Sequence, residues 1–192
     1  AGLDEGLATI ERNARVQTQI IEDLLDMSRI TSGKLRLDIQ TVHLAQCVEA
    51  AVETVRPSAA AKALRLETML DPLAGPVLGD PNRLQQILWN LLSNAVKFTP
   101  RYGRIQVLLE RVNSHIEISV ADTGPGLKEE VSERLYEAFF STKAEGLGIG
   151  LSLCRTIIES HRGRIRAQNL YNGTQPVGCR FSFTLPVDLG SR

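Results

Sequence analysis

The sequence has 192 residues, of which 43% are apolar and 23% are charged, and these proportions are ordinary for a soluble globular protein with a proper core. Its 22 basic and 22 acidic side chains cancel, so the charge argues against nucleic acid or an anionic membrane as a partner. No apolar run approaches the roughly 18 residues of a membrane span, which excludes a membrane segment from this sequence.

The start of the sequence has no signal-like pattern, and we expect a cytoplasmic protein or the cytoplasmic part of a longer one. The cysteines are Cys47, Cys154 and Cys179. Because they are odd in number and far apart, we expect small core thiols rather than disulfides or metal ligands.

The spacing of residues 3 to 30 predicts one long helix. Its mostly apolar stripe alternates between steps of four and three residues and comprises Leu3, Leu7, Ile10, Ala14, Gln17, Ile21, Leu24 and Ser28. An isolated amphipathic helix is marginal in water, so this one needs a partner. We expect another helix to supply that partner, and the alternative is that the helix lies on its own domain.

The middle of the sequence alternates between strand and helix patterns. We expect a strand through Leu35, Leu37 and Ile39, a helix over residues 44–62 and a strand over residues 64–70. Asp80-Pro81 then begins a helix that ends before Pro100, with Asp80 as the cap and proline at the first helical position.

The last third predicts a β-hairpin, two more helices and two final strands. The hairpin strands carry Ile105 to Leu109 and Ile116 to Val120, and the helices cover about 128–136 and 148–161. We therefore expect an α/β two-layer sandwich, with a mixed, largely antiparallel sheet packed on three helices, preceded by the long amphipathic helix.

Two amides share one face of the predicted helix over residues 81–99. Asn90 and Asn94 are four residues apart among apolar neighbours, and amide oxygens suit a hard cation such as Mg²⁺. Lys97 and Phe98 follow, offering a counter-charge for phosphate and an aromatic wall. The alternative is a hydrated helix face on which Lys97 complements the helix dipole.

Two glycine-rich segments follow. In Asp122-Thr123-Gly124-Pro125-Gly126, the carboxylate can accept a hydrogen bond from an exocyclic amine such as that of adenine, although the segment is also ordinary turn chemistry. Gly146-Leu147-Gly148-Ile149-Gly150 precedes a helix, where free backbone N–H groups can cradle phosphate. The alternative there is a flexible loop, and Thr142 and Lys143 upstream favour phosphate contact.

The order of these segments resembles the catalytic, ATP-binding domain of sensor histidine kinases, which share their ATP sandwich with gyrase B and the mismatch-repair ATPases. Asp80 to Thr99 resembles the N box, Asp122 to Leu127 the G1 box, Tyr136 to Lys143 the F box and Gly146 to Leu151 the G2 box. The resemblance spans about residues 35–187. Residues 22–30 resemble the second helix of the family's dimerisation and histidine-phosphotransfer hairpin.

The resemblance implies a site for ATP and Mg²⁺. It assigns Asn94 to Mg²⁺, Asn90 to the region of the metal and the γ-phosphate, Lys97 to phosphate, and Asp122 to the adenine amine. The full set of residues that it implies for the nucleotide is Asn90, Asn94, Lys97, Phe98, Asp122, Gly124, Gly126, Leu127, Thr142, Lys143, Gly146, Leu147, Gly148, Ile149, Gly150 and Leu151.

The resemblance also implies a domain organisation and partners. We expect residues 1–33 to be the hairpin's second helix with a linker, residues 34–187 the ATP-binding domain and residues 188–192 a tail. The expected partners are the histidine-bearing hairpin, a response-regulator receiver domain and, through the N-terminal helix, a second copy of the chain.

Two departures from the family qualify this picture. None of His43, His115 and His161 stands in an acceptor-histidine motif, so we expect the acceptor to lie elsewhere and the chain to bind Mg-ATP without labelling itself. The lid near residues 139–147 is short, and Arg162 stands where a second glycine is usual.

The resemblance implies transfer of the γ-phosphoryl of ATP to a histidine. Related ATPases place a water-activating glutamate where this sequence has Asn90, which favours transfer over hydrolysis. The alternatives are an ATPase of the gyrase or mismatch-repair type and a non-catalytic module whose nucleotide tunes dimerisation.

Overall fold

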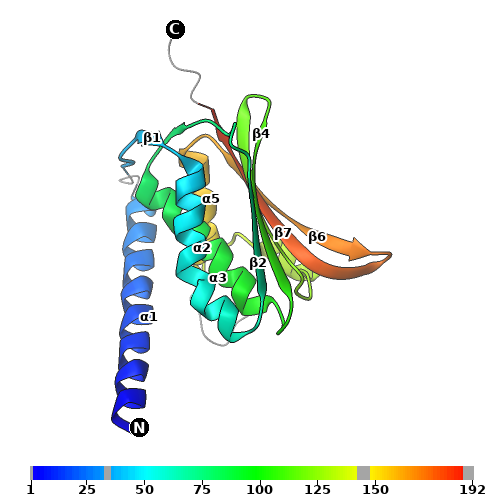
Figure 1. Ribbon diagram of the computed structural model, residues 1–192. Helices are drawn as coiled ribbons and strands as arrows, with labels where there is room; N and C mark the ends of the chain where they lie inside the picture. Colours follow the sequence, from blue (N-terminus) through cyan, green and yellow to red (C-terminus); the bar gives the residue numbers. More distant parts are fainter. Residues whose placement is uncertain (1, 33–35, 142–147, 188–192) are drawn as a thin grey trace.

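Helices cover one face of a sheet in the computed structural model, which describes residues 2–32, 36–141 and 148–187. A long first helix stands beside this helical layer, on the side away from the sheet (Figure 1). The helices are α1 (Gly2–Thr31), α2 (Leu44–Ala61), α3 (Pro81–Phe98), α4 (Glu129–Arg134) and α5 (Gly150–Ser160). The strands are β1 (Gln40–Val42), β2 (Arg65–Leu70), β3 (Val77–Gly79), β4 (Arg104–Val112), β5 (His115–Asp122), β6 (Arg164–Asn172) and β7 (Gln175–Pro186).

The strands of the described residues form two sheets. The larger has the order β2-β4-β5-β7-β6, with β2 parallel to β4 and every other neighbouring pair antiparallel. The smaller pairs β1 with β3. The expected mixed and largely antiparallel sheet is therefore confirmed, as is the β4–β5 hairpin.

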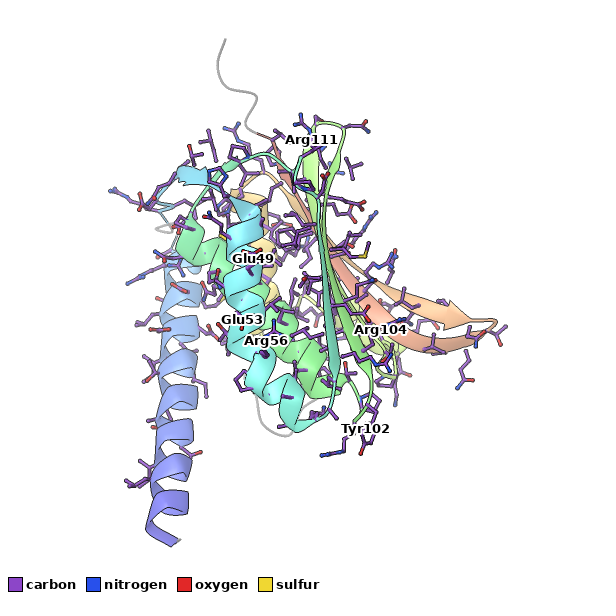
Figure 2. All side chains as sticks on the ribbon, in the orientation of Figure 1. Glu49, Glu53, Arg56, Tyr102, Arg104 and Arg111 are labelled. Atoms are coloured by element: carbon purple, nitrogen blue, oxygen red, sulfur yellow. The ribbon has the colours of Figure 1, made fainter. Side chains whose placement is uncertain are left out.

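The core lies between the large sheet and α2, α3 and α5. Ile105, Val107 and Leu109 of β4 are fully buried and alternate with more exposed residues, as expected for a strand with one covered face. Val48 and Ala51 are fully buried on the inner face of α2, whereas the labelled Glu49, Glu53 and Arg56 of the same helix are exposed (Figure 2).

Asp80 begins α3 as the sequence predicts. Its side chain accepts hydrogen bonds from the backbone N–H groups of Asn82 and Arg83, at 3.0 and 3.2 Å, and proline occupies the first helical position. The other carboxylate oxygen of Asp80 accepts from the backbone N–H of Asp38. The cap thus fixes both the helix start and the segment that leads into β1.

His161 has a structural place beneath this cap. It is buried, and its Nε2 accepts a hydrogen bond of 2.9 Å from the backbone N–H of Asp80. The other ring nitrogen, Nδ1, lies 2.7 Å from the carbonyl oxygen of Ile157, so it donates there. Both nitrogens are therefore occupied, in agreement with the expectation that His161 is not a phosphoryl acceptor.

The expected strand over residues 35–39 is wrong. Leu35 lies outside the described residues, and residues 36–39 carry no regular structure. Pairing begins only at Gln40, because β3 is three residues long and its register runs from Gln40–Gly79 to Val42–Val77. The sequence analysis missed β3, since three residues are too few to show a period.

Helix α1 is confirmed over its expected length, but its apolar stripe does not face the domain. Asp26 is buried and Asp23 and Met27 are half-buried, so this side of the helix contacts the rest of the chain. Ile21 and Leu24 of the stripe remain 57% and 42% exposed.

The cysteines match the expectation of free thiols. Cys154 and Cys179 are buried, Cys47 is half-buried, and all three are free thiols. Among the described residues, none of the helices combines the length and the apolar character that crossing a membrane requires.

Candidate nucleotide site

Asp122 lies at the end of β5, where it is 7% exposed. Its Oδ1 accepts a hydrogen bond of 2.8 Å from the backbone N–H of Gly124. Burial raises the pKa of this carboxyl, and backbone hydrogen bonds from Gly124 and Cys179 oppose the rise. The loop after β5 is thus folded around a buried carboxyl group.

The loop from Thr123 to Lys128 fits tightly against its neighbours. A Cβ on Gly124 would lie 2.7 Å from Oδ1 of Asp122 and 3.2 Å from the carbonyl oxygen of Phe98. Gly126 has a φ of +77°, which favours glycine, and a Cβ there would lie 2.9 Å from Oδ1 of Asn169. The end of α3 and the G1-like loop therefore meet at Phe98 and Gly124.

Asn90 of α3 lies against the first turn of α5. The Asn90 side chain is 8% exposed, and its Oδ1 would be 3.0 Å from a Cβ on Gly150. The buried Nδ2 of Asn90 has no hydrogen-bond partner among the described residues. The Cys154 thiol is close enough for the Asn90 side chain to lower the pKa of that thiol without forming a well-aligned hydrogen bond, so this amide could bind a further polar group.

The start of α5 leaves backbone N–H groups for a ligand. Ile149 precedes the helix, and no described side chain forms a cap hydrogen bond there. Gly148 has a φ of +66°, and its carbonyl oxygen accepts a hydrogen bond from the backbone N–H of Phe139. A Cβ on Gly148 would lie 2.4 Å from the carbonyl oxygen of Phe140, so only glycine fits against this segment.

Tyr136 is half-buried near the thiols of β7 and α5. Burial raises the pKa of its phenol, and Cys179 on β7 and Cys154 on α5 raise it further. Its buried Oη has no hydrogen-bond partner within the described ranges. Burial also raises the pKa of both thiols to about 12, so all three groups are protonated at neutral pH.

The other residues that the sequence predicts for the site differ in how far they are buried. Asn94 is half-buried one turn after Asn90, Lys97 is exposed, and Phe98 is 43% exposed at the end of α3. Ile149 is buried, and Leu127 and Leu151 are half-buried. Thr142, Lys143, Gly146 and Leu147 lie outside the described residues.

Two polar side chains that the sequence analysis did not single out hold this site in shape. Asn169 of β6 accepts from the backbone N–H of Leu127 at 2.6 Å and donates to its carbonyl oxygen at 2.7 Å. Lys62 donates from Nζ to the carbonyl oxygens of Val96, Lys97 and Thr99, which end α3. Their partners lie more than 30 residues away in the chain, so no local pattern could have revealed them.

The described residues offer no cluster of three His, Cys, Asp or Glu side chains that could hold a metal ion. The polar donors that the site does offer are amides and backbone N–H groups. The amide oxygens of Asn90 and Asn94 could ligate a Mg²⁺ ion that keeps several waters and takes phosphate oxygens, whereas the backbone N–H groups suit phosphate rather than a cation.

Comparisons with known proteins agree with this geometry. Residues 79–189 match the model of the histidine kinase-, DNA gyrase B- and HSP90-like ATPase family. Adaptive-response sensory kinase SasA of Gloeothece citriformis is 35% identical over 178 residues, which cover 90% of this chain and 44% of that protein. The chain thus spans less than half the length of this relative.

Two solved structures are similar in fold and sequence. Full-length ShkA in complex with AMPPNP has a TM-score of 0.76 and 28% identity, covering 88% of this chain and 35% of that chain. Histidine kinase ThkA in complex with the response regulator protein TrrA has a TM-score of 0.70 and 25% identity, covering 89% of this chain and 49% of that chain.

Proposed function

The chain belongs to the histidine kinase-, DNA gyrase B- and HSP90-like ATPase family, and from that premise we propose that it transfers the γ-phosphoryl group of Mg-ATP to a histidine. In this proposal it is the catalytic and ATP-binding portion of a sensor histidine kinase. Residues 34–187 form the ATP-binding domain, residues 188–192 a tail, and residues 1–33 the second helix of the dimerisation hairpin with its linker.

One observation carries the proposal. The buried amide of Asn90 lies against the start of α5, where no described side chain forms a cap hydrogen bond, and Asp122 is a buried carboxyl group at the end of β5. A carboxylate suits the exocyclic amine of adenine, and a helix start suits phosphate. ATP carries both groups at opposite ends, so one ligand meets both needs. The AMPPNP complex of ShkA supports the same ligand class.

The residues around Asp122 are proposed to bind the base. Gly124 and Gly126, which have no Cβ, would let the backbone approach a flat ring, and Leu127 and Phe98 would supply apolar contacts to it. Asp122 accepts from the adenine amine in its ionised form. Guanine carries an oxygen where adenine carries this amine, so the carboxylate would reject it.

The phosphate end is proposed to involve three groups of residues. Asn94, together with Asn90, would hold Mg²⁺, which when bound neutralises phosphate charge and orients the transferred group. Lys97 supplies a further positive charge. The backbone of residues 146–151 would cradle the phosphates, and Thr142 and Lys143 would contact them from the lid.

Asn90 makes transfer to a side chain the favoured chemistry. An amide cannot accept a proton from water as a carboxylate does, so position 90 supplies no general base to activate water. Catalysis would then depend on positioning and charge neutralisation. The phosphoryl group moves to a histidine nitrogen, and ADP leaves with the electron pair of the broken bond.

The partners of the intact protein are also part of the proposal. The histidine-bearing helix of the hairpin would pair with α1, whose exposed Ile21 and Leu24 support a helical partner, and a second copy would complete the bundle. The ThkA–TrrA complex supports a response-regulator receiver domain as the next acceptor. We place these events in the cytoplasm.

Incubation of the purified chain with γ-labelled Mg-ATP tests the choice between transfer and hydrolysis. We expect saturable ATP binding, no sustained release of inorganic phosphate and no label on the chain itself. Sustained release of inorganic phosphate by the wild-type chain that Asp122→Ala abolishes would instead establish an ATPase. Acid-labile phosphate on the isolated chain would contradict the assignment of the acceptor to another segment.

A further inference from the structure

Three side-chain positions form a row across neighbouring strands beneath the loop that follows β5. Asp122 of β5 is opposite Cys179 of β7, and Cys179 is in turn opposite Asn169 of β6. Asp122 and Cys179 are buried and Asn169 is half-buried. Residues that are directly opposite share a face of the sheet, so all three project towards the loop and the helices.

The two ends of the row hold the two ends of the loop. Asp122 accepts the N–H of Gly124, and Asn169 binds Leu127 through both its backbone N–H and its carbonyl oxygen. Gly126, between these points, has positive φ and lies against Asn169 Oδ1. Both the oxygen and the nitrogen of the Asn169 amide thus form hydrogen bonds with one residue of the loop, Leu127.

We propose that Asn169 is a positioning residue of the base pocket, which fixes Leu127 so that Asp122 can discriminate adenine from other bases. The inference rests on the proposed function and extends it to a residue outside the sequence motifs. Asp122 alone anchors only the first half of the loop. Without Asn169, Gly126 and Leu127 lose their side-chain anchor, and the floor of the pocket can move away from the base.

The size of the effect follows from the two hydrogen bonds. A tenfold change in an equilibrium constant corresponds to about 1.4 kcal/mol, which is within the range expected for the loss of one to two neutral hydrogen bonds. The lost hydrogen bonds destabilise the free protein as well as the complex, and only the difference between the two changes the affinity. We therefore expect the adenine-dependent affinity to fall about tenfold.

Calorimetric titration with ADP and with inosine diphosphate tests the inference. Inosine carries an oxygen in place of the adenine amine, so the ratio of the two affinities measures base reading separately from phosphate binding. We expect the wild-type chain to prefer ADP, and Asn169→Ala to narrow that preference about tenfold. A general loss of structure would weaken the binding of both nucleotides alike and leave the ratio of their affinities unchanged.

Two further variants complete the design. Asn169→Asp keeps the side-chain size but replaces the donor to Leu127 with an acceptor, so it should also narrow the preference even where the alanine variant folds poorly. Gln168→Ala is the matched control, because Gln168 is the exposed neighbour on the opposite face of β6. It should leave the preference unchanged.

The outcomes separate the inference from the function on which it rests. If the wild-type chain prefers ADP and both Asn169 variants keep the full preference, the inference is wrong and the proposed function stands. If the wild-type chain binds both nucleotides equally, base reading and the inference fail together. If it binds neither, the proposed function fails as well.

Discussion

The Asn90 carboxamide of α3 lies directly against Gly150, the first residue of α5. A Cβ at position 150 would be 3.0 Å from the Asn90 side-chain oxygen and 3.6 Å from its Cγ. This contact brings the helix that carries the amide pair against the helix start that would bind phosphate. It therefore fixes the geometry of the proposed phosphate end of the site.

Gly150→Ala should weaken ATP binding without lowering the stability of the nucleotide-free chain. The new methyl group would displace the Asn90 amide by a few tenths of an ångström, and losing one charge-assisted contact should weaken ATP binding roughly tenfold. Alanine is the better helix former by about 1 kcal/mol, so the nucleotide-free chain should be no less stable. Calorimetric titration and thermal unfolding give the two readouts.

Gly75→Ala is the control for that variant, because a Cβ at position 75 meets nothing within 4 Å. It should leave ATP affinity unchanged. If the wild-type chain and Gly150→Ala bound ATP with equal affinity, the Asn90–Gly150 contact would have no part in nucleotide binding.

The pH dependence of nucleotide binding should report Asp122. Burial raises the pKa of this carboxyl above its ordinary value of 3.8, and only the carboxylate accepts from the adenine amine without donating. ADP affinity should therefore fall as the pH falls through the raised pKa. The contribution of Asp122 to protein stability should move the other way, because its folded-state pKa exceeds its unfolded one and protonation favours the fold.

Titrations of ADP from neutral pH downward measure this step. Asp122→Asn cannot ionise, so it should bind ADP weakly throughout the range and lack the step. If the wild-type chain and Asp122→Asn lost affinity in parallel, another group would be responsible.

The ion pair between Asp26 and Arg83 should hold α1 on the domain. The two side chains are only 7% and 18% exposed, and Gln86 also donates to Asp26. Arg83→Met would remove the shorter of the two Asp26 ion pairs and leave the carboxylate only the exposed Arg29, at 3.7 Å, so the cost should be somewhat below the roughly 3 kcal/mol typical of a fully unpaired buried charge. We expect faster amide exchange in the second half of α1 and a lower free energy of unfolding.

The control pair is Glu53 and Arg56, which are exposed on α2 (Figure 2). Arg56→Met should change neither amide exchange in α1 nor the free energy of unfolding measurably, because exposed ion pairs contribute little. The double variant Asp26→Leu with Arg83→Met should recover part of the loss. Unchanged exchange in Arg83→Met would show that α1 docks by other contacts.

Local patterns were enough to predict most of the fold. Asp80-Pro81 specifies the start of α3 through chemistry within four residues, and the alternation in β4 and β5 follows from one covered face. The expected strand over 35–39 failed because pairing, which alternation alone does not encode, starts only at Gln40. A strand exists only where a partner strand supplies hydrogen bonds.

The site was only partly predictable for the same reason. Asp122 and Gly124 interact within three residues of sequence, whereas Asn169 meets Leu127 across 42 positions. The docking of α1 was also hidden, since Asp26 is buried by an arginine 57 positions away rather than by apolar neighbours. These contacts are set by the topology of the sheet and by helix packing.

Transfer of phosphate to a supplied histidine tests the central claim most directly. The chain is mixed with γ-labelled Mg-ATP and a separately produced hairpin that bears the acceptor histidine, with Asp122→Ala run in parallel. The account predicts acid-labile, base-stable label on the hairpin, dependent on ATP and lost in Asp122→Ala. ATP binding without any label on the hairpin would contradict it.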